Sequence, residues 1–177
     1  MTLRKGHCST TVKRANTRKS KVKSKSYVKT IPPNKLAKYM MGDVPGFYSN
    51  KYKFSVSLLV GDAIQLRDNA LEAARQLLHR HLENKVKGNY FMLLRAYPHH
   101  IVREHKMLTG AGADRMSSGM AHSFGVPTGV SAQMKKGRPI LSIFCNKDQV
   151  ALVRDILHMA RTKLPGNKMV VVEEINR

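Results

Sequence analysis

The sequence predicts a two-layer α+β domain preceded by a basic N-terminal extension. Two segments have helical apolar spacing, several short segments are rich in strand formers, and two of these short segments flank a tight basic turn. This combination favours helices packed on antiparallel strands over a doubly wound parallel sheet. A length of 177 residues suffices for one globular unit. We expect the extension and an adjoining turn to occupy residues 1–42 and the globular domain to occupy residues 43–177.

The first elements after the extension are a turn, a loop and a strand. "TIPPNKLAKYMMGD" is typical of a proline-restricted turn leading into a short segment, and "VPGFYSNKYK" is typical of a loop. "FSVSLLV", residues 54–60, alternates large apolar residues with smaller ones. This alternation predicts a strand with one buried face. The residues on that face would be Phe54, Val56, Leu58 and Val60.

A helix and an interior strand follow. "RDNALEAARQLLHRHLEN" predicts an amphipathic helix, in which Asn69 and Glu72 resemble a capping box. Its apolar stripe consists of Ala70, Ala74, Leu77, Leu78 and Leu82. After the stop at Gly88, "NYFMLLRAY" is mostly apolar and rich in strand formers, which predicts an interior strand.

The second half predicts a hairpin, a helix and a final strand. "PTGVSAQM" and "PILSIFCN" flank "KKGR", which predicts a β-hairpin with a basic turn. "KDQVALVRDILHMARTKL" predicts a helix with a cap at Asn146 and Gln149, and Pro165-Gly166 ends it. Its stripe consists of Val150, Val153, Ile156, Leu157 and Ala160. "KMVVVEEI" predicts a closing strand.

The net charge of +21, with a pI near 10.4, favours a polyanionic partner because a compact fold would otherwise repel itself. Nucleic acid is the favoured partner. An anionic membrane is the rival, but it calls for a basic amphipathic helix with bulky apolar residues, which the sequence does not show. We expect a soluble intracellular protein, since the sequence has neither a bilayer-spanning apolar stretch nor a signal-peptide pattern. Cys8 and Cys145 belong to no disulfide or zinc pattern and are expected to be reduced thiols.

Residues 1–42 contain twelve Lys or Arg, and the first acidic residue is Asp43. The segment has no apolar period, so we expect it to be disordered in isolation and ordered by phosphate contacts. A solubilising tail or a localisation signal is the alternative, but interleaved hydroxyls and Tyr27 favour an RNA-binding arm. The predicted RNA contacts are Arg4, Lys5, Lys13, Arg14, Arg18, Lys19, Lys21, Lys23, Lys25, Lys29 and Lys35, with Lys135, Lys136 and Arg138 in the hairpin turn.

Catalysis and metal binding are not predicted. The acidic residues Glu72, Asp148 and Asp155 fit helix caps or solvated positions rather than an acid–base pair. His79 and His81 do not share a helix face, and the sequence contains no Gly-x-Ser-x-Gly motif. A second histidine group has no Cys or Asp at ligand spacing, and it would contact nucleotides or pack against the neighbouring loop. That group consists of His99, His100 and His105.

The loop "KMLTGAGADRMSSGM", residues 106–120, lacks the glycine pattern of a dinucleotide site and the Gly-Lys-Ser/Thr of a phosphate loop. Its four smallest consecutive residues, 110–113, leave the backbone bare enough for a bulky partner to approach closely. Asp114 would begin a short helix reaching to about Ser123. Backbone N–H groups just before its start would form an anion site, with Lys106 and Arg115 adding charge on either side. A glycine linker, with Met116 and Met120 packed into the core, is the alternative.

Several motifs carry a family resemblance. "PHHIVREHKMLTGAGADRMSSGM", "FGVPTG", "ALEAARQ", "IPPNKLAKYMMGD" and "GRPILSI" resemble the ribosomal protein family L ten e of archaea and eukaryotes, the equivalent of bacterial L sixteen. The likeness covers about residues 29–170 and looks archaeal. The start departs from the family, which usually has Cys-Tyr-Arg and Pro-Tyr-Thr-Arg-Lys. Here only Cys8 and "TRK" at 17–19 remain, so individual contacts of the extension are not carried over.

The resemblance implies an α/β-hammerhead fold and a structural, non-catalytic place in the large subunit of the cytoplasmic ribosome, without a cofactor. It also implies contacts with large-subunit rRNA near the peptidyl transferase centre, with neighbouring ribosomal proteins, and with tRNA through the loop at 103–119. The loop residues are Arg103, His105, Lys106, Met107, Thr109, Gly110, Ala111, Gly112, Ala113, Asp114 and Arg115. A free-standing RNA-binding or assembly protein, or an RNA-modifying enzyme, are the alternatives.

Overall fold

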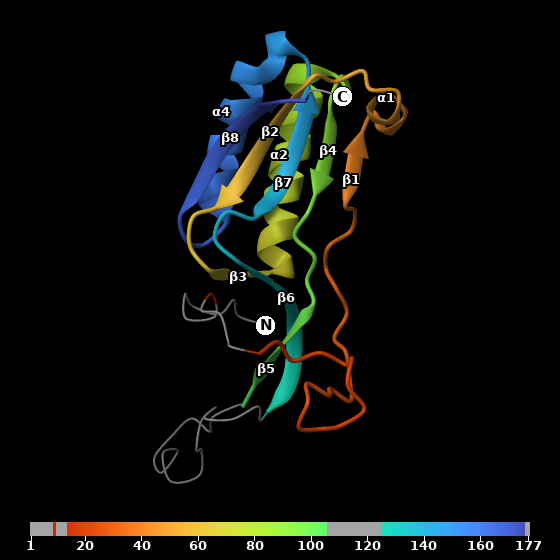
Figure 1. Ribbon diagram of the computed structural model, residues 1–177, viewed down its shortest axis with the longest axis vertical. Coiled ribbons are helices and arrows are strands. Elements are labelled where there is room, and N and C mark those ends of the chain that lie inside the picture. The colour runs from red at the N-terminus through yellow and green to blue at the C-terminus, as the bar shows by residue number, and fades with distance from the viewer. Residues whose placement is uncertain (1–8, 10–13, 106–124, 176–177) are drawn as a thin grey trace.

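The computed structural model describes residues 9, 14–105 and 125–175, which form two antiparallel sheets and a helical layer (Figure 1). The five-stranded sheet has the order β1-β4-β7-β2-β8, and the three-stranded sheet has the order β3-β6-β5. The strands are β1 Met40–Gly42, β2 Phe54–Val60, β3 Ile64–Arg67, β4 Phe91–Leu94, β5 His100–Glu104, β6 Val126–Met134, β7 Pro139–Cys145 and β8 Lys168–Glu174. The helices are α1 Val44–Tyr48, α2 Asp68–Val86, α4 Val150–Ala160 and the 3-10 turns η2 Lys147–Gln149 and η3 Arg161–Lys163.

Helices α2 and α4 cover one face of the five-stranded sheet, so the predicted α+β class is confirmed (Figure 1). The main core lies between the two layers. Leu78 and Leu82 of α2 and Ile156 of α4 are fully buried there with Leu58 of β2. Both predicted helical stripes therefore face the sheet, as their apolar period requires. The finer hammerhead assignment stays a prediction.

Strand β2 spans the predicted residues, but the expectation of one buried face is wrong. Ser55 and Ser57, on the opposite face from Val56, are each only 6% exposed. The strand lies between β7 and β8, and the hydroxyl oxygens of Ser57 and Ser142 are 2.8 Å apart across the β2–β7 pair. Side chains of the neighbouring strands, Ser142 of β7 and Val171 of β8, lie on either side of Ser57, which explains why its short hydroxyl side chain is little exposed.

The outer face of the sheet carries a small aromatic cluster. The segment 44–53, predicted as a loop, contains α1, which Asp43 caps by accepting a hydrogen bond from the Gly46 N–H at 2.9 Å. Phe47 of this helix stacks on Phe91 with ring centroids 4.3 Å apart, and it lies 4.6 Å from the Phe144 ring. The cap and the cluster hold a helix of only five residues that its local apolar pattern does not predict.

The predicted hairpin between β6 and β7 is wrong. The two strands are joined by the turn at 135–138, but β6 pairs with β3 and β5, whereas β7 pairs with β2 and β4. The turn pairs with the end of β2 instead, since the Gly137 N–H donates to the Val60 carbonyl at 2.8 Å. The chain also passes from one sheet to the other at 61–63 and at 95–99, so three short links connect the sheets.

Helix α2 begins at Asp68, and the predicted capping box is wrong. The Glu72 carboxylate accepts from the Arg75 side chain and from the Ala37 N–H, and Asp68 accepts from the Lys35 N–H. The Arg75 hydrogen bond is the largest influence that lowers the pKa of Glu72 to about 2. Glu72 therefore fastens residue 37 to the helix instead of capping it, whereas Asp68 holds residue 35 and also accepts from the Asn69 N–H of the first turn at 2.9 Å. Strand β3 directly before the helix was not predicted.

The last helix and strand occur where predicted, but the predicted cap at Asn146 and Gln149 makes no side-chain hydrogen bond to the helix start. The other end of the helix is closed by Lys168, whose ammonium group donates to the carbonyl oxygens of Arg161 and Leu164. Burial lowers the pKa of this lysine. The first residue of β8 thereby satisfies carbonyl groups that a helix end leaves without partners.

Candidate nucleic-acid interface

The N-terminal extension lies along the three-stranded sheet and is hydrogen-bonded to it (Figure 1). The Asn16 N–H donates to Nδ1 of His100 at 2.9 Å, and the Ile101 N–H donates to the Asn16 carbonyl at 2.9 Å. These two bonds join the extension to the start of β5, 84 residues further along the chain. The extension is therefore part of the folded unit in this region.

Val28 provides the apolar half of this attachment. It is 1% exposed and forms a small core with Ile101 of β5 and Val130 of β6. The absence of an apolar period in the extension did not indicate this burial, because a single valine among polar residues has no periodic signal. Residues 1–8 and 10–13, including the predicted contacts Arg4, Lys5 and Lys13, lie outside the described residues.

Between Asn16 and Val28 the extension makes a compact excursion that exposes its cations. The Thr17 N–H donates to the Ser26 carbonyl at 2.9 Å, and the Lys25 N–H donates to the Val22 carbonyl at 2.9 Å. Ser26 itself has a φ of 73°. The backbone is thus closed into a loop whose basic side chains face solvent; these are Arg18, Lys19, Lys21, Lys23 and Lys25.

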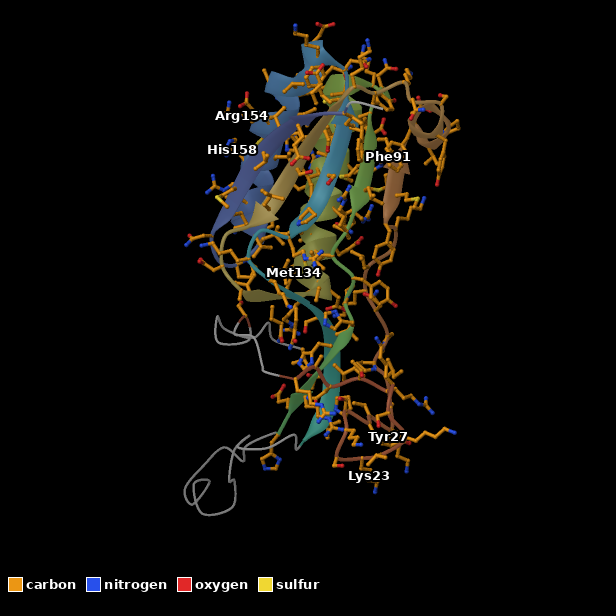
Figure 2. All side chains as sticks on the ribbon, viewed as in Figure 1. Lys23, Tyr27, Phe91, Met134, Arg154 and His158 are labelled. Carbon is orange, nitrogen blue, oxygen red and sulfur yellow. The ribbon has the colours of Figure 1, made fainter. Side chains whose placement is uncertain are left out.

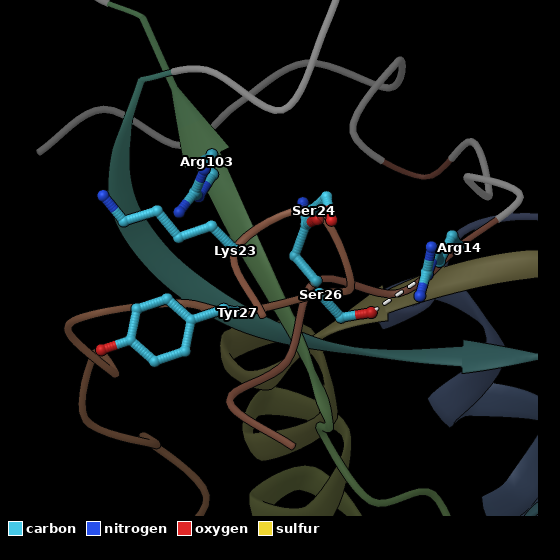
Figure 3. Close-up of a pocket in the computed structure, with 7 residues that line it drawn as sticks. Arg14, Lys23, Ser24, Ser26, Tyr27 and Arg103 are labelled. Carbon is cyan, nitrogen blue, oxygen red and sulfur yellow. Dashed lines mark hydrogen bonds between the residues drawn. The ribbon is translucent and has the colours of Figure 1, made fainter. Parts of the chain in front are cut away.

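A cationic pocket lies between this excursion and β5, with a volume of about 540 Å³ (Figure 3). Its charged lining residues are Arg14, Lys23 and Arg103, so segments nearly ninety residues apart contribute to one concavity. The Arg14 Nε donates to the Ser26 hydroxyl at 3.1 Å. The remaining lining residues are Asn16, Ser24, Ser26 and Tyr27, and none of the seven is acidic.

This arrangement suits a phosphate group. Guanidinium and ammonium groups form short charge-assisted hydrogen bonds to phosphate oxygens, and hydroxyls of serine and tyrosine reach phosphate and sugar oxygens. Figure 3 shows the Lys23 and Arg103 side chains close together above the Tyr27 ring. A nucleotide placed here would meet two cations and one aromatic face. Arg14 and Lys23, predicted as RNA contacts, are brought together with Arg103, which was predicted as part of the loop toward tRNA, and Tyr27 is beside them.

His100 lies at the base of the interface, and its imidazole ring is neutral. It is 4% exposed, and burial, reinforced by the nearby His99, lowers its pKa to about 4. A neutral imidazole can accept the Asn16 N–H at Nδ1, whereas a protonated ring would present a second donor to that N–H. The described contact of His100 is with Asn16 of the extension, and His100 lies at the start of β5 whereas the loop follows the end of that strand. Nucleotide contact and packing against the loop, the two roles expected for this histidine group, both stay predictions.

Acidification is expected to loosen this attachment. The folded pKa is near 4 and the ordinary value is 6.5, so the unfolded chain binds more protons between these values. The His100 contribution is complete above pH 6.5 and is lost as pH falls toward 4, by roughly 3 kcal/mol in all. His100→Asn retains an acceptor near the Nδ1 position but cannot titrate.

Melting temperatures between pH 7 and pH 4 measure this effect. The wild-type chain should lose more stability on acidification than His100→Asn, while His99→Asn, which keeps the buried imidazole, should still lose more than His100→Asn. Equal pH profiles for wild type and His100→Asn would show that the buried imidazole is not the titrating group.

The other predicted contacts are spread over the molecule. Lys29 and Lys35 are exposed along the extension, and the turn residues Lys135, Lys136 and Arg138 are exposed at the junction of the sheets. Figure 2 places Met134, just before that turn, well away from Lys23 and Tyr27. Arg103 lies in β5, and His105 is the first residue after that strand. The loop residues Lys106, Met107, Thr109, Gly110, Ala111, Gly112, Ala113, Asp114 and Arg115, and the expected short helix, fall outside the described residues.

Three other features would indicate a different function in the described part of the chain: a metal site, a reactive thiol or a membrane-spanning helix. Within residues 9, 14–105 and 125–175, no group of three or more His, Cys, Asp or Glu is placed to hold a metal ion. Burial raises the pKa of the Cys145 thiol to about 11, which disfavours its reactive thiolate. No helix among the same residues has both the length and the apolar character needed to cross a bilayer.

Fold and pocket together define a basic α+β protein with a cationic concavity suited to phosphate groups. Residues 12–171 match the family described as Ribosomal protein L16p/L10e. Large ribosomal subunit protein uL16 of Halobacterium salinarum is 41% identical over 141 residues, covering 79% of this chain and 80% of the relative. The chain belongs to the ribosomal protein L16p/L10e family, which confirms the resemblance seen in the sequence.

Other relatives with the same name give a consistent picture. The protein of Hyperthermus butylicus is 38% identical over 142 residues, covering 80% of this chain and 77% of the relative. That of Methanospirillum hungatei is 38% identical over 150 residues, covering 84% and 86%. Membership of a ribosomal protein family confirms the predictions of a ribosomal, archaeal-type protein and of a non-enzymatic role.

Proposed function

We propose that this protein is a structural constituent of the large ribosomal subunit in the cytoplasm. It binds large-subunit rRNA near the peptidyl transferase centre and the tRNA path, together with neighbouring ribosomal proteins. The observation that carries the proposal is the cationic pocket, in which Arg14, Lys23 and Arg103 converge without an acidic neighbour in the lining. Relatives named large ribosomal subunit protein uL16 support the assignment to that subunit.

Binding would rest on phosphate contacts and shape rather than on reading base sequence. Lys23 of the excursion lines the pocket, the other exposed cations of the excursion lie on the same segment, and those of the turn at 135–138 give a second, separate contact. A protein with two separate basic surfaces can contact more than one RNA element. The alternative function, a free-standing RNA-binding or assembly protein, would use the same surface but would not remain in the mature subunit.

The loop at 103–119 is proposed to reach the tRNA path. The two strands that precede and follow this loop pair at their ends, where Glu104 of β5 lies opposite Val126 of β6. The intervening residues therefore begin and end at adjacent strand ends. The segment thus begins from the same sheet edge that carries Arg103 of the pocket. The small residues at 110–113 would let the backbone fit between folded RNA elements.

Sedimentation through salt gradients tests the main proposal. A tagged full-length chain, expressed in place of the genomic copy, should remain with mature large subunits at high salt. Recovery of the chain only on precursor particles, or its release from mature subunits at moderate salt, would favour the assembly-factor alternative. A chain absent from large-subunit fractions would overturn the proposal.

Deleting residues 109–113 is expected to leave the chain in the large subunit but to reduce translation, because the RNA-binding surfaces remain while the bare segment is lost. Polysome profiles and the content of the chain in large subunits measure the two parts separately. Ala111→Ser, which adds only a hydroxyl within the same segment, is the control and should resemble the wild type. Wild-type polysome levels in the deletion strain would contradict the role of the loop.

A further inference from the structure

The link at residues 95–99 between β4 and β5 presents three side chains in a row. Arg95, Tyr97 and His99 are exposed, whereas the intervening Ala96 and the following His100 are buried. Such alternation is that of an extended chain, in which every second side chain points to the same side. The N–H groups of Arg95 and Ala96 both donate to the Ile140 carbonyl, at 2.9 and 3.0 Å. We call Arg95, Tyr97 and His99 the neck row.

Tyr97 is a large aromatic surface that is held rigid and left open. The residue is 64% exposed, and its ring stacks on Tyr39 with centroids 5.8 Å apart and planes inclined by 24°. Tyr39 is fixed in turn, since the Asn34 amide donates to its hydroxyl at 3.1 Å. Pro98 restricts the backbone of Tyr97 to extended conformations. The ring therefore loses little freedom if a flat partner covers its outer face.

The residues on either side of Tyr97 are polar, and a hydrogen bond orients the ring of His99. The Tyr97 carbonyl can only accept, so the 3.1 Å contact requires His99 to donate from Nδ1, which leaves Nε2 as the acceptor of the neutral ring. Arg95 adds an exposed cation on the other side of Tyr97. The carboxylates that contact residues 35–37, those of Asp68 and Glu72, accept from backbone N–H groups there.

We propose that the neck row binds one unpaired nucleotide of RNA. The base stacks on the outer face of Tyr97, Arg95 bonds the adjoining phosphate, and Nε2 of His99 accepts from a sugar hydroxyl or a base amino group. Paired RNA is bound through phosphates and shape and offers no free base face, whereas an unpaired base seeks an aromatic platform. A cation beside the exposed ring favours RNA over an apolar protein partner. The inference rests on the proposed function and deepens it.

Tyr97→Trp provides a direct reporter, because the chain contains no tryptophan. An oligoadenylate of eight nucleotides should quench the single tryptophan by stacking on it, with saturation as the probe is added to the full-length chain. Inorganic polyphosphate carries similar charge without bases, and it should bind the chain while leaving the emission nearly unchanged. Equal responses to both probes, or no response to oligoadenylate, would overturn the stacking arrangement.

Affinity measurements test the natural residue. Tyr97→Ala should weaken oligoadenylate binding about tenfold, whereas Tyr97→Phe should bind like the wild type. Because the side chain is mostly exposed, neither change is expected to unfold the domain, and circular dichroism checks this. Tyr48→Ala is the matched control, since Tyr48 is 69% exposed on α1 at the far end of the molecule (Figure 1). A tenfold loss in Tyr48→Ala as well would overturn the site.

Ultraviolet crosslinking of assembled large subunits separates this inference from the function on which it rests. A nucleotide adduct on the peptide containing Tyr97 supports the neck row, and a crosslink from that peptide to another protein overturns it. If the chain sediments with large subunits while Tyr97→Ala binds oligoadenylate as tightly as the wild type, only the neck row fails. If the chain is absent from large subunits, the proposed function fails regardless of the oligoadenylate result.

Discussion

Replacing Arg14, Lys23 and Arg103 together by glutamine is expected to weaken binding to large-subunit rRNA by about 100- to 500-fold near 0.1 M salt. All three cations line the pocket, and each phosphate contact contributes roughly 0.7 to 0.9 to the slope of log affinity against log salt. The slope should therefore decrease by about 2 to 3. Filter binding across a series of salt concentrations gives both quantities.

A matched triple variant separates the pocket from net charge. Lys85, Lys147 and Arg154 are exposed on and beside the helices, and Figure 2 places Arg154 at the opposite end of the molecule from Lys23. Their replacement by glutamine removes the same charge but should lower affinity far less. If the two triple variants lose affinity equally, the pocket has no special role and only the total charge matters.

Val28→Asp is expected to destabilise the three-stranded sheet by about 3 kcal/mol or more, because it places a carboxylate among apolar residues. Val28 is 1% exposed and packs only with Ile101 and Val130 in its cluster. The extension should detach, so the N–H groups of Asn16 and Ile101 should exchange with solvent much faster. Hydrogen exchange and thermal melting measure the two effects.

Val22→Asp is the control for this change. Val22 lies in the same extension but is 52% exposed, so the variant alters the charge equally without burying a carboxylate. Its amide exchange and melting should remain close to those of the wild type. Unchanged protection of Asn16 and Ile101 in Val28→Asp would show that the valine does not anchor the extension.

Local pattern predicted the elements of this fold well. The spacing of Leu78 and Leu82 is a property of a few helical turns, and the alternation in residues 54–60 is a property of one strand. Both survive folding because a buried face needs them. The burial of Ser57 was not predicted, since it depends on β7 and β8 lying on either side of β2.

Pairing and capping were predicted less well because distant segments decide them. The turn at 135–138 is equally compatible with a hairpin and with a passage between sheets, and the choice follows from Val60, far earlier in the chain. Glu72 has the spacing of a capping residue, but it is bound by Arg75 and by the Ala37 N–H. A local motif cannot reveal such competitors.

The sequence predicted which cations belong to the candidate site, but it did not predict that three of them lie together in one pocket. Arg14, Lys23 and Arg103 meet only because the extension folds against β5, and the anchor of that attachment, Val28, has no periodic signal in the sequence. The exposed Tyr97 was assigned to an interior strand, which in fact ends at Leu94. Its signal was the alternation of polar and small residues in "RAYPHH", which the apolar run before it concealed.

The attachment of Asn16 to His100 and of Val28 to Val130 sets an order of events during synthesis. The extension is made first, but its binding partners follow 84 residues later for Asn16, and about 100 residues later for Val28. At a ribosomal speed of about 5–20 residues per second, that delay is on the order of 5 to 20 s. The nascent chain thus carries its densest positive charge before the strands that bind the extension have been synthesised. During that interval, messenger or transfer RNA can compete with rRNA for the basic extension.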